Sequence, residues 1–403
     1  MAEEVNHCKV VHLGQTCQVC EVDDWLLLPI PVVGRSMLSD GSLVTESLTK
    51  CTCSNCGLVQ HVDAKQGDNI RDYFGSSYSL GDHEPNIGFE GGRQKQYVEW
   101  IAGSLGQFRP ESILELGCGN GALLKELMTA FCPAKAVGLE PSERSVKWAQ
   151  KCGLPVHCAY IAGEDSVRGF KADLIVSVNV IEHTLHPVRF LRAAKAAIND
   201  GGLVLVVCPD GSAIGSELLF FDHLYSFCPS NVVNLVQSSG LTPVDYRRSP
   251  PALPGFQMII AAVNPQEEYK FQKEFTPAGV DVDKLHANRA SYLTRWKHLD
   301  ARLCGAMAGF RTTTVFGVGE MARLLRAYAP STWKRIDYFV VDDPIETDFF
   351  GHPVISFTEW RATTSELVLL AVSQHSVDKL SARLRAAGHS VLAIDDLHCS
   401  LSS

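Results

Sequence analysis

The central part of the chain alternates continuous apolar runs with segments of helical periodicity. Strands buried on both faces of a parallel sheet consist largely of Val, Ile and Leu, and the apolar runs here have that composition. Strands separated by helices of this length are typical of a mostly parallel sheet with helices on both faces. The predicted strands cover residues 112–118, 134–141, 173–180, 201–210, 241–249 and 256–264, and the predicted helices cover 94–105, 120–131, 143–153, 187–199 and 230–240. We therefore predict a Rossmann-like α/β domain over residues 93–265.

A second strand–helix pattern follows after an amphipathic helical linker over residues 266–310. Its apolar strands and amphipathic helices predict a separate Rossmann-like α/β domain over residues 311–403. Before the central domain lie a cysteine-containing module, residues 1–63, and a polar connector, residues 64–92. The chain is long enough for more than one hydrophobic core, so a division into these parts is expected.

Charge and hydropathy limit the classes of partner. The 403 residues carry a formal net charge of -9 and contain no run of Lys and Arg, which argues against nucleic acid as the partner. The longest apolar stretches, Trp25–Val33 and Leu203–Val207, are too short to cross a membrane. The polar, acidic beginning of the chain does not resemble a secretory signal. We expect a cytoplasmic protein with a small-molecule substrate; the sequence does not determine the oligomeric state, and a monomer is compatible with it.

Two cysteine pairs lie in the N-terminal module. Cys17 and Cys20, like Cys53 and Cys56, are separated by two residues, a spacing that lets both thiolates of one turn bind a tetrahedral zinc ion. Gly57 suits the tight turn after the second pair. A redox CxxC is the alternative, but such a pair begins a helix after a strand, and neither pair does. Other cysteines and histidines of the module are alternative ligands: Cys8, Cys51, His7, His12 and His61. We predict a structural zinc site, because four protein ligands leave no open position.

The remaining cysteines are scattered among apolar segments. Without an export signal, disulfides are not expected. Free cysteine is a frequent core residue. The following are therefore expected to be reduced and buried: Cys118, Cys132, Cys152, Cys158 and Cys208.

The most specific motif is Ile-Leu-Glu-Leu-Gly-Cys-Gly-Asn-Gly, which ends the first predicted strand of the central domain. Gly117, Gly119 and Gly121 stand between a strand and a helix, where a side chain would block the approach of a ligand to the backbone. Their G-x-G-x-G spacing, preceded by Glu115, fits an adenosine–amino acid ligand better than a pyrophosphate. Glu140 ends the next strand, roughly twenty residues on, where an acid accepts hydrogen bonds from both ribose hydroxyls.

This block resembles the class I methyltransferases that depend on S-adenosylmethionine (SAM). Residues 115–121 match the first motif of that family, and Glu140 matches its ribose-binding acid. The resemblance implies that Glu164 or Asp165 lies near the adenine. It also implies that Asn179, in the segment SVNVIEH, lies beside the methionine part of SAM and the substrate.

The whole chain resembles a three-part family of sugar C-methyltransferases that act on nucleotide-linked deoxyhexoses in antibiotic pathways. The matching segments are CQVC, CSNCGLVQ, DYFGSSYS, ELGCGNG, VIEHTLHP, FFDHLYSF and FGVGEMARLL. In that family the histidine of a Tyr-x-Glu-His stretch is assigned as the base. Here His223 occupies this position, while Asp222 replaces the glutamate and Phe220 replaces the tyrosine.

Carbon methylation explains the need for a histidine. The carbon nucleophile is most easily an enolate, formed by removing a proton beside a ketone, and a group with an ordinary pKa near ~6.5 suits that step at neutral pH. We predict His223 as the base, with Asp222 orienting it or stabilising its charge. His183 is a second catalytic candidate and matches a position near the family's substrate. Tyr78 of the connector and Phe220 complete the predicted substrate contacts.

Two alternatives remain open at this stage. The same scaffold could methylate oxygen or nitrogen of another small molecule, which needs only a general base or proximity. A non-catalytic scaffold that docks partners through the zinc module is the alternative from another class. In the C-terminal domain, Gly317 and Gly319 follow a strand, but Glu320 and Ala322 interrupt the dinucleotide spacing. By the family resemblance this domain helps to shape the substrate site, and we assign it no second cofactor.

Overall fold

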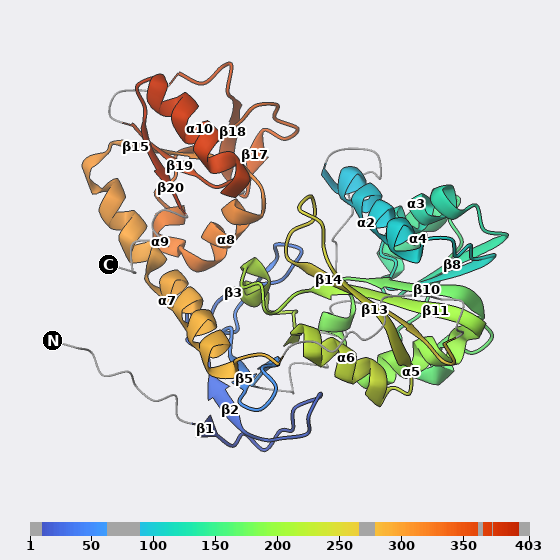
Figure 1. The fold of residues 1–403 in the computed structure, drawn as a ribbon. Coiled ribbons are helices and arrows are strands. Elements are labelled where there is room, and N and C mark those ends of the chain that lie inside the picture. Colours follow the sequence, from blue (N-terminus) through green and yellow to red (C-terminus); the bar gives the residue numbers. More distant parts are fainter. Residues whose placement is uncertain (1–9, 63–88, 266–278, 362–365, 373, 395–403) are drawn as a thin grey trace. The chain divides into compact units, whose positions relative to one another are not determined.

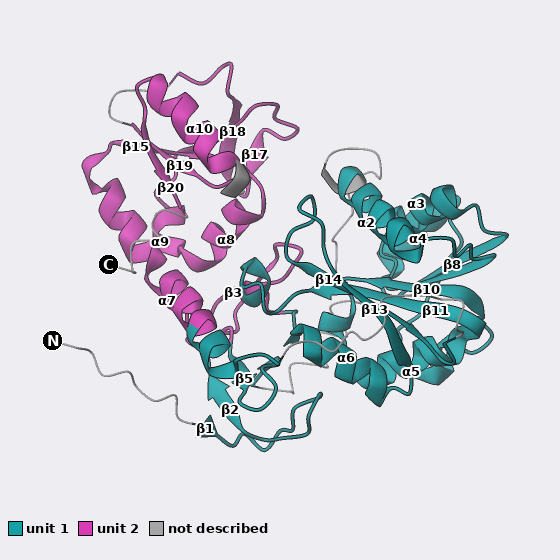
Figure 2. Cartoon of the chain, in the orientation of Figure 1, with its two compact units in different colours: residues 1–28, 49–218, 222–287 teal, residues 29–48, 219–221, 288–403 magenta. Residues whose placement is uncertain are grey.

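The computed structural model describes residues 10–62, 89–265, 279–361, 366–372 and 374–394. The chain folds into two compact units (Figure 2). Unit 1 comprises residues 1–28, 49–218 and 222–287, and unit 2 comprises residues 29–48, 219–221 and 288–403. The cysteine pairs and the central α/β domain both belong to unit 1. The five-part division of the sequence stays a prediction, and Tyr78 and most of its connector lie outside the described residues.

A seven-stranded sheet forms the centre of unit 1 (Figure 1). Its order is β13-β14-β11-β10-β7-β8-β9, and β9, β8, β7, β10 and β11 are parallel, whereas β14 pairs antiparallel with both neighbours. The strands are β7 (Ser112–Leu116), β8 (Lys135–Glu140), β9 (Val156–Cys158), β10 (Ala172–Val178), β11 (Ile198–Pro209), β13 (Thr242–Arg248) and β14 (Phe256–Ala262). The predicted mostly parallel sheet is confirmed. The short strand β9 was not predicted, because only one of its three residues is buried.

Helices cover both faces of this sheet (Figure 1). Helices α2, α3 and α4 lie on one face, and α5 and α6 lie on the other. Their bounds are α2 (Phe89–Leu105), α3 (Ala122–Phe131), α4 (Glu143–Lys151), α5 (Pro187–Ala197) and α6 (Pro229–Ser238). Apolar side chains of α2, α3 and the strands form one buried cluster, so the core lies between helix and sheet. The predicted Rossmann-like arrangement of residues 93–265 is therefore confirmed.

Unit 1 contains a second, antiparallel sheet. Its order is β1-β2-β5-β6-β12, with β1 (Val10–Val11), β2 (Trp25–Leu27), β5 (Lys50–Cys53), β6 (Val59–His61) and β12 (Tyr225–Ser226). Strand β12 comes from the central domain: Tyr225 pairs with Gln60 and Ser226 pairs with Val59. The amide of His61 also donates to the carbonyl of Leu224 at 3.2 Å. The cysteine module and the segment after His223 thus share one sheet.

Unit 2 carries the second α/β pattern. Strands β18, β16, β15, β19 and β20 form parallel pairs in that order, and β17 pairs antiparallel with β18. Their bounds are β15 (Thr312–Phe316), β16 (Tyr338–Val341), β17 (Asp348–Phe349), β18 (His352–Ser356), β19 (Glu366–Leu370) and β20 (Ser390–Ala393). The helices of this part are α8 (Glu320–Tyr328), α9 (Pro330–Trp333) and α10 (Gln374–Ala386). The predicted C-terminal α/β fold is confirmed, although β17 and β18 were not predicted.

Two smaller features complete the description. Residues 29–48 of unit 2 contain a two-stranded sheet of β3 (Ser36–Met37) and β4 (Leu43–Val44). The predicted helical linker contains α7 (Val282–Ala306) and buries Leu285, Leu293, Trp296 and Leu299, as its amphipathic pattern predicted. Among the described helices, none combines the length and the apolar character that crossing a membrane requires.

Candidate active site and metal centre

The glycine loop joins β7 to α3. All three of its glycines have left-handed backbone angles, with φ of 77° at Gly117, 54° at Gly119 and 80° at Gly121. A Cβ atom at Gly117 would lie 2.4 Å from a methyl carbon of Val180, and one at Gly121 would lie 2.7 Å from a methyl carbon of Leu154. A Cβ atom at Gly119 would have no neighbour within 4 Å. Two of the glycines are therefore required by packing inside the protein, whereas Gly119 faces open space.

That open space is a cavity of about 230 Å³ at the carboxyl ends of the parallel strands. Its lining includes five of the predicted cofactor residues, namely Glu115, Gly117, Gly119, Glu140 and Asn179, and also His183. In open parallel α/β sheets, ligands bind in the crevice at these strand ends, beside the point where the strand order reverses. Here that point lies between β7 and β10, where the cavity is found.

Two acidic residues of the cavity lie in different hydrogen-bonding environments. Glu140 accepts the amide of Gly119 at 2.8 Å on Oε2 and the amide of Ser142 at 2.9 Å on Oε1. Each carboxylate oxygen can accept a second bond, so Glu140 retains capacity for a ligand diol. Glu115 is 2% exposed, and its Oε2 has no hydrogen-bond partner among the described residues. Burial raises the pKa of both carboxyl groups, and the charge of Glu140 raises that of Glu115 further.

Helix α2 supplies a pair of cavity residues that no sequence motif indicated. Arg93 and Tyr97, one helical turn apart, both line the cavity. The side chain of Arg93 donates to the Tyr97 hydroxyl at 3.2 Å, and Asn179 Nδ2 donates to the same oxygen at 3.1 Å. Asn179 itself adopts a left-handed φ of 55°, an uncommon conformation that places it at the end of β10. The spacing of Arg93 and Tyr97 on one helix face was the available sequence signal.

The predicted adenine contacts do not line the cavity. Glu164 and Asp165 begin a short 3-10 helix and are exposed, and Asp165 pairs with Arg168 at 2.6 Å. Tyr160 and Ile161, from the same loop, line the cavity instead. The placement of Glu164 or Asp165 near an adenine therefore stays a prediction.

Two histidines predicted from separate motifs lie together. The rings of His183 and His223 are 4.7 Å apart between centroids and nearly perpendicular, at 88°. His183 Nδ1 bonds to the backbone carbonyl of Asp222 at 2.8 Å and lies 3.7 Å from Asp222 Oδ2. His223 Nδ1 lies 3.7 Å from Oε2 of Glu217, a residue that no sequence motif indicated. Each imidazole thus has a carboxylate nearby, and the one beside His183 is Asp222.

Burial controls the protonation of this group. It lowers the pKa of His223 well below its usual range, and the neighbouring His183 lowers it further. Burial also lowers the pKa of His183. It raises the pKa of the adjacent Glu182 to about 8. Burial therefore favours the neutral form of both imidazoles.

Phe220, predicted as a substrate contact, belongs to residues 219–221 of unit 2. It is 7% exposed and forms an isolated bridge with Met37 of the same unit. Gly317, also in unit 2, lies where a Cβ atom would be 2.7 Å from the carbonyl oxygen of Ala371. Strand packing accounts for this glycine without a bound cofactor.

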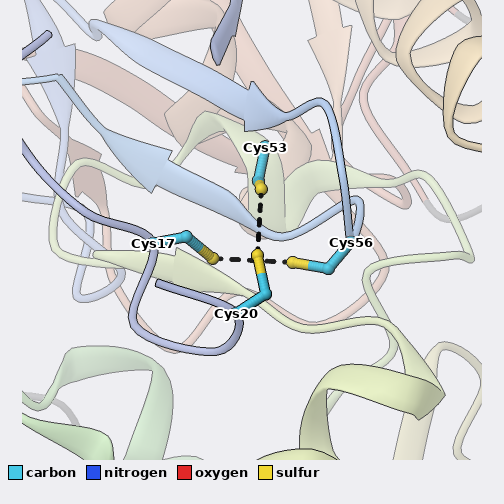
Figure 3. A group of neighbouring side chains, drawn as sticks. All are labelled: Cys17, Cys20, Cys53 and Cys56. Atoms are coloured by element: carbon cyan, nitrogen blue, oxygen red, sulfur yellow. Dashed lines mark hydrogen bonds between the residues drawn. The ribbon is translucent and has the colours of Figure 1, made fainter. Parts of the chain in front are cut away.

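The four cysteines predicted as metal ligands converge in unit 1 (Figure 3). Their sulfur atoms all lie within 4.8 Å of one another, with Cys17 to Cys56 and Cys20 to Cys53 both at 3.5 Å. Tetrahedral zinc with Zn–S bonds near 2.3 Å requires sulfur separations of about 3.8 Å. Cys51 is not part of this group, since its thiol donates to the carbonyl of Gln60 at 3.3 Å. The donor set fits zinc.

The two cysteine turns have the same backbone geometry. The amide of Glu21 donates to the carbonyl of Cys17 at 3.0 Å, and the amide of Gly57 donates to that of Cys53 at 3.0 Å. Both residues are left-handed, with φ of 61° at Glu21 and 74° at Gly57. Each turn therefore presents its two sulfurs in the same way, although only one has the expected glycine.

The prediction that five other cysteines are buried is partly wrong. Cys118 and Cys208 are buried, but Cys132, Cys152 and Cys158 are exposed. Cys132 and Cys152 cap the ends of α3 and α4, and Cys158 ends β9, a strand with two exposed residues of three. Their positions at element ends explain the exposure.

Residues 89–245 match the family model described as a methyltransferase domain. Together with this match, the strand order and its antiparallel β14 show that the central part of unit 1 has the class I, SAM-dependent methyltransferase fold. The family predicted for the central block is thus confirmed as to fold, whereas the sugar C-methyltransferase resemblance stays a prediction.

Similar proteins match the same region. The ubiquinone biosynthesis O-methyltransferase of Cereibacter sphaeroides is 28% identical over 159 residues, covering 34% of this chain and 63% of that protein. The corresponding protein of Methylobacterium nodulans is 28% identical over 153 residues, covering 33% and 61%. The chain thus spans about three-fifths of the length of these relatives. Among solved structures, the chain is similar to magnesium protoporphyrin IX methyltransferase from Synechocystis, which was solved with bound SAH (S-adenosylhomocysteine). The two are 16% identical with a TM-score of 0.37, and the match covers 48% of this chain and 98% of that one.

Proposed function

We propose that this protein is a SAM-dependent methyltransferase of a small molecule. The observation that supports this proposal is that Gly119, Glu140 and Glu115 all line one cavity. Gly119 leaves room for the donor against the backbone, and Glu140 accepts hydrogen bonds from the ribose hydroxyls. Glu115, with an unpartnered oxygen, accepts from the ammonium group of the methionine part. Arg93, at the same cavity, pairs with the methionine carboxylate.

The proposal includes carbon methylation of a keto sugar linked to a nucleotide, with His223 as base. Neutral His223 takes a proton from the carbon beside the ketone, and the electron pair of that C–H bond forms an enolate. The enolate carbon bonds to the methyl group of SAM as the S–CH3 bond breaks, and neutral S-adenosylhomocysteine leaves. His183, which contacts His223 and lines the donor cavity, positions the acceptor beside the methyl group.

Oxygen methylation is the second candidate, favoured by the O-methyltransferases to which residues of this domain are similar. The same neutral imidazole would then take a hydroxyl proton. The two routes differ in one observable, because only the carbon route exchanges a C–H proton with solvent.

The test is incubation of the enzyme with a 4-keto deoxysugar nucleotide in deuterated buffer without SAM. We expect exchange of one proton beside the ketone, detected by mass spectrometry and lost in His223→Ala. His157→Ala, which changes an exposed histidine outside the cavity lining, is the matched control and should exchange normally. Exchange in His223→Ala at the wild-type rate would exclude this residue as base; no exchange with any keto sugar would exclude the carbon route.

We propose in addition that Cys17, Cys20, Cys53 and Cys56 bind one structural zinc ion. Four thiolates complete a tetrahedron and leave no position for substrate. Zinc would stabilise the turns before β2 and after β5 by joining them through one ion. Metal analysis of the purified chain should therefore find one tightly bound zinc ion.

A further inference from the structure

Glu182 places a buried carboxyl group beside the two histidines. It is 1% exposed, and neither of its side-chain oxygens has a hydrogen-bond partner among the described residues. It stands at the carboxyl end of β10, in the short helix Ile181–His183. A buried carboxyl group without partners is costly to the fold unless it binds a proton or a cation.

The two histidines supply neutral nitrogens next to this carboxyl group. One ligand atom each from Glu182, His183 and His223 lies within 4.8 Å of the others. His183 Nδ1 must be the protonated nitrogen, because its partner at 2.8 Å is the backbone carbonyl of Asp222, which only accepts. The lone pair of His183 is therefore on Nε2, and the carbonyl bond fixes the ring, as a hydrogen bond to the other ring nitrogen does in metal-binding imidazoles.

The surrounding charge favours a cation. Glu217 and Asp222 both act on Glu182 as negative neighbours, whereas Arg93 acts as a positive one. Lys50 is the positive neighbour of both histidines. Three carboxyl groups thus surround two imidazoles in a region with little solvent. A divalent cation among them would be attracted by these three carboxyl groups, against the two positive neighbours Arg93 and Lys50.

We propose that Glu182, His183 and His223 form a binding site for a divalent transition metal ion, and that this ion inhibits the enzyme. Two imidazoles and one carboxylate suit Mn2+, Fe2+, Co2+, Ni2+ or Zn2+ better than Mg2+ or Ca2+. Inhibition rests on the proposed function, in which His223 is the base. A metal ion takes the lone pair that His223 needs to accept a proton, so metal binding and proton removal exclude each other. The site is distinct from the four cysteines, which would keep their own zinc.

Binding is tested with Co2+ as the probe, added to the zinc-replete full-length protein. We expect one Co2+ per chain, with a visible ligand-field absorption and without the charge-transfer band that thiolate ligands produce. Glu182→Gln should weaken binding at least about tenfold, since even the loss of a hydrogen-bond partner of a metal ligand changes metal affinity by ~10–100-fold. Glu143→Gln, which removes an exposed carboxylate on α4, is the control and should bind as wild type does. Equal binding by Glu182→Gln and wild type, or a thiolate band with release of zinc, would overturn the site.

Inhibition is tested separately, by methyl transfer and proton exchange measured over the same Co2+ titration. Activity should fall with the midpoint of the absorption change and return when a chelator removes Co2+. Unchanged or increased activity at full occupancy would overturn the inhibitory role. If the metal-free enzyme exchanges no proton with any keto sugar, the base assignment fails, while the absorption titration still decides whether the metal site exists.

Discussion

The change of Gly119 to alanine separates donor binding from folding. Gly119 has a left-handed φ of 54°, which an alanine adopts at a cost of about 1–2 kcal/mol. Its added methyl group would meet no atom within 4 Å beyond its two chain neighbours, so overpacking contributes little to the loss of stability. The methyl group would instead occupy cavity space that the proposed donor needs. We therefore expect Gly119→Ala to fold, with a free energy of unfolding reduced by about 1–2 kcal/mol.

Gly117→Ala is the matched comparison in the same loop. Its methyl group would lie 2.4 Å from Val180, so a steric term is added to a similar backbone term. Overpacking costs about 1–3 kcal/mol and the left-handed backbone about 1–2 kcal/mol, so a total loss of about 2–5 kcal/mol is expected. Gly117→Ala should thus be the less stable variant of the two.

The assay combines denaturant unfolding with calorimetric titration of S-adenosylhomocysteine. Gly119→Ala should bind at least about tenfold more weakly than wild type, which corresponds to a loss of about 1.4 kcal/mol. Wild-type affinity in folded Gly119→Ala would refute the placement of the donor against this loop. Equal destabilisation of the two variants would refute the packing argument.

Three further predictions concern single residues. Because the pKa of Glu115 in the folded protein is raised above the unfolded value of 4.5, wild type loses stability as pH rises from that value through the folded pKa. Glu115→Gln removes this loss, so the difference in melting temperature between this variant and wild type should grow in favour of the variant from pH 5 to 8. The variant should also bind S-adenosylhomocysteine more weakly than wild type. A difference in melting temperature that does not depend on pH would contradict the burial argument. Cys56→Ser should abolish zinc binding and lower the melting temperature, whereas Cys51→Ser should keep one zinc ion; metal analysis of both variants decides this. Glu21→Gly should raise the free energy of unfolding by about 0.5–1 kcal/mol, because glycine adopts the left-handed φ of 61° at this exposed position without strain. A loss of stability in denaturant unfolding would show that the Glu21 turn is not strained.

Patterning predicted the central domain well because its strands are buried on both faces. Their continuous apolar runs leave little ambiguity, and the glycine loop and Glu140 then follow at fixed places in the strand order. Strands β9, β12 and β17 have two or three residues each, too few for a period to be recognised.

The candidate site was predicted only in part, because some of its contacts depend on distant segments. The motifs indicated His183 and His223 separately, but their contact across forty residues of chain is a property of the fold. Glu217 belongs to no motif, and Glu182 lies in the segment VIEHTLHP without a role assigned to it; the significance of each arises from its place beside an imidazole. Arg93 was missed because the predicted helix began at residue 94, whereas α2 begins at Phe89.

The sharing of β12 between the cysteine module and the central domain would, on the proposed zinc and base assignments, link the metal site to the catalytic histidine. His223 precedes β12 by two residues, and on the other side Cys228 donates its thiol to the carbonyl of Gly57 at 3.7 Å. The amide side chain of Asn231 also donates to the carbonyl of Cys56 at 3.0 Å. Removal of zinc would release these anchors and let the base move, while the glycine loop on the far strands stays intact. On these proposed assignments, a zinc-free protein would keep its affinity for the methyl donor and lose methyl transfer.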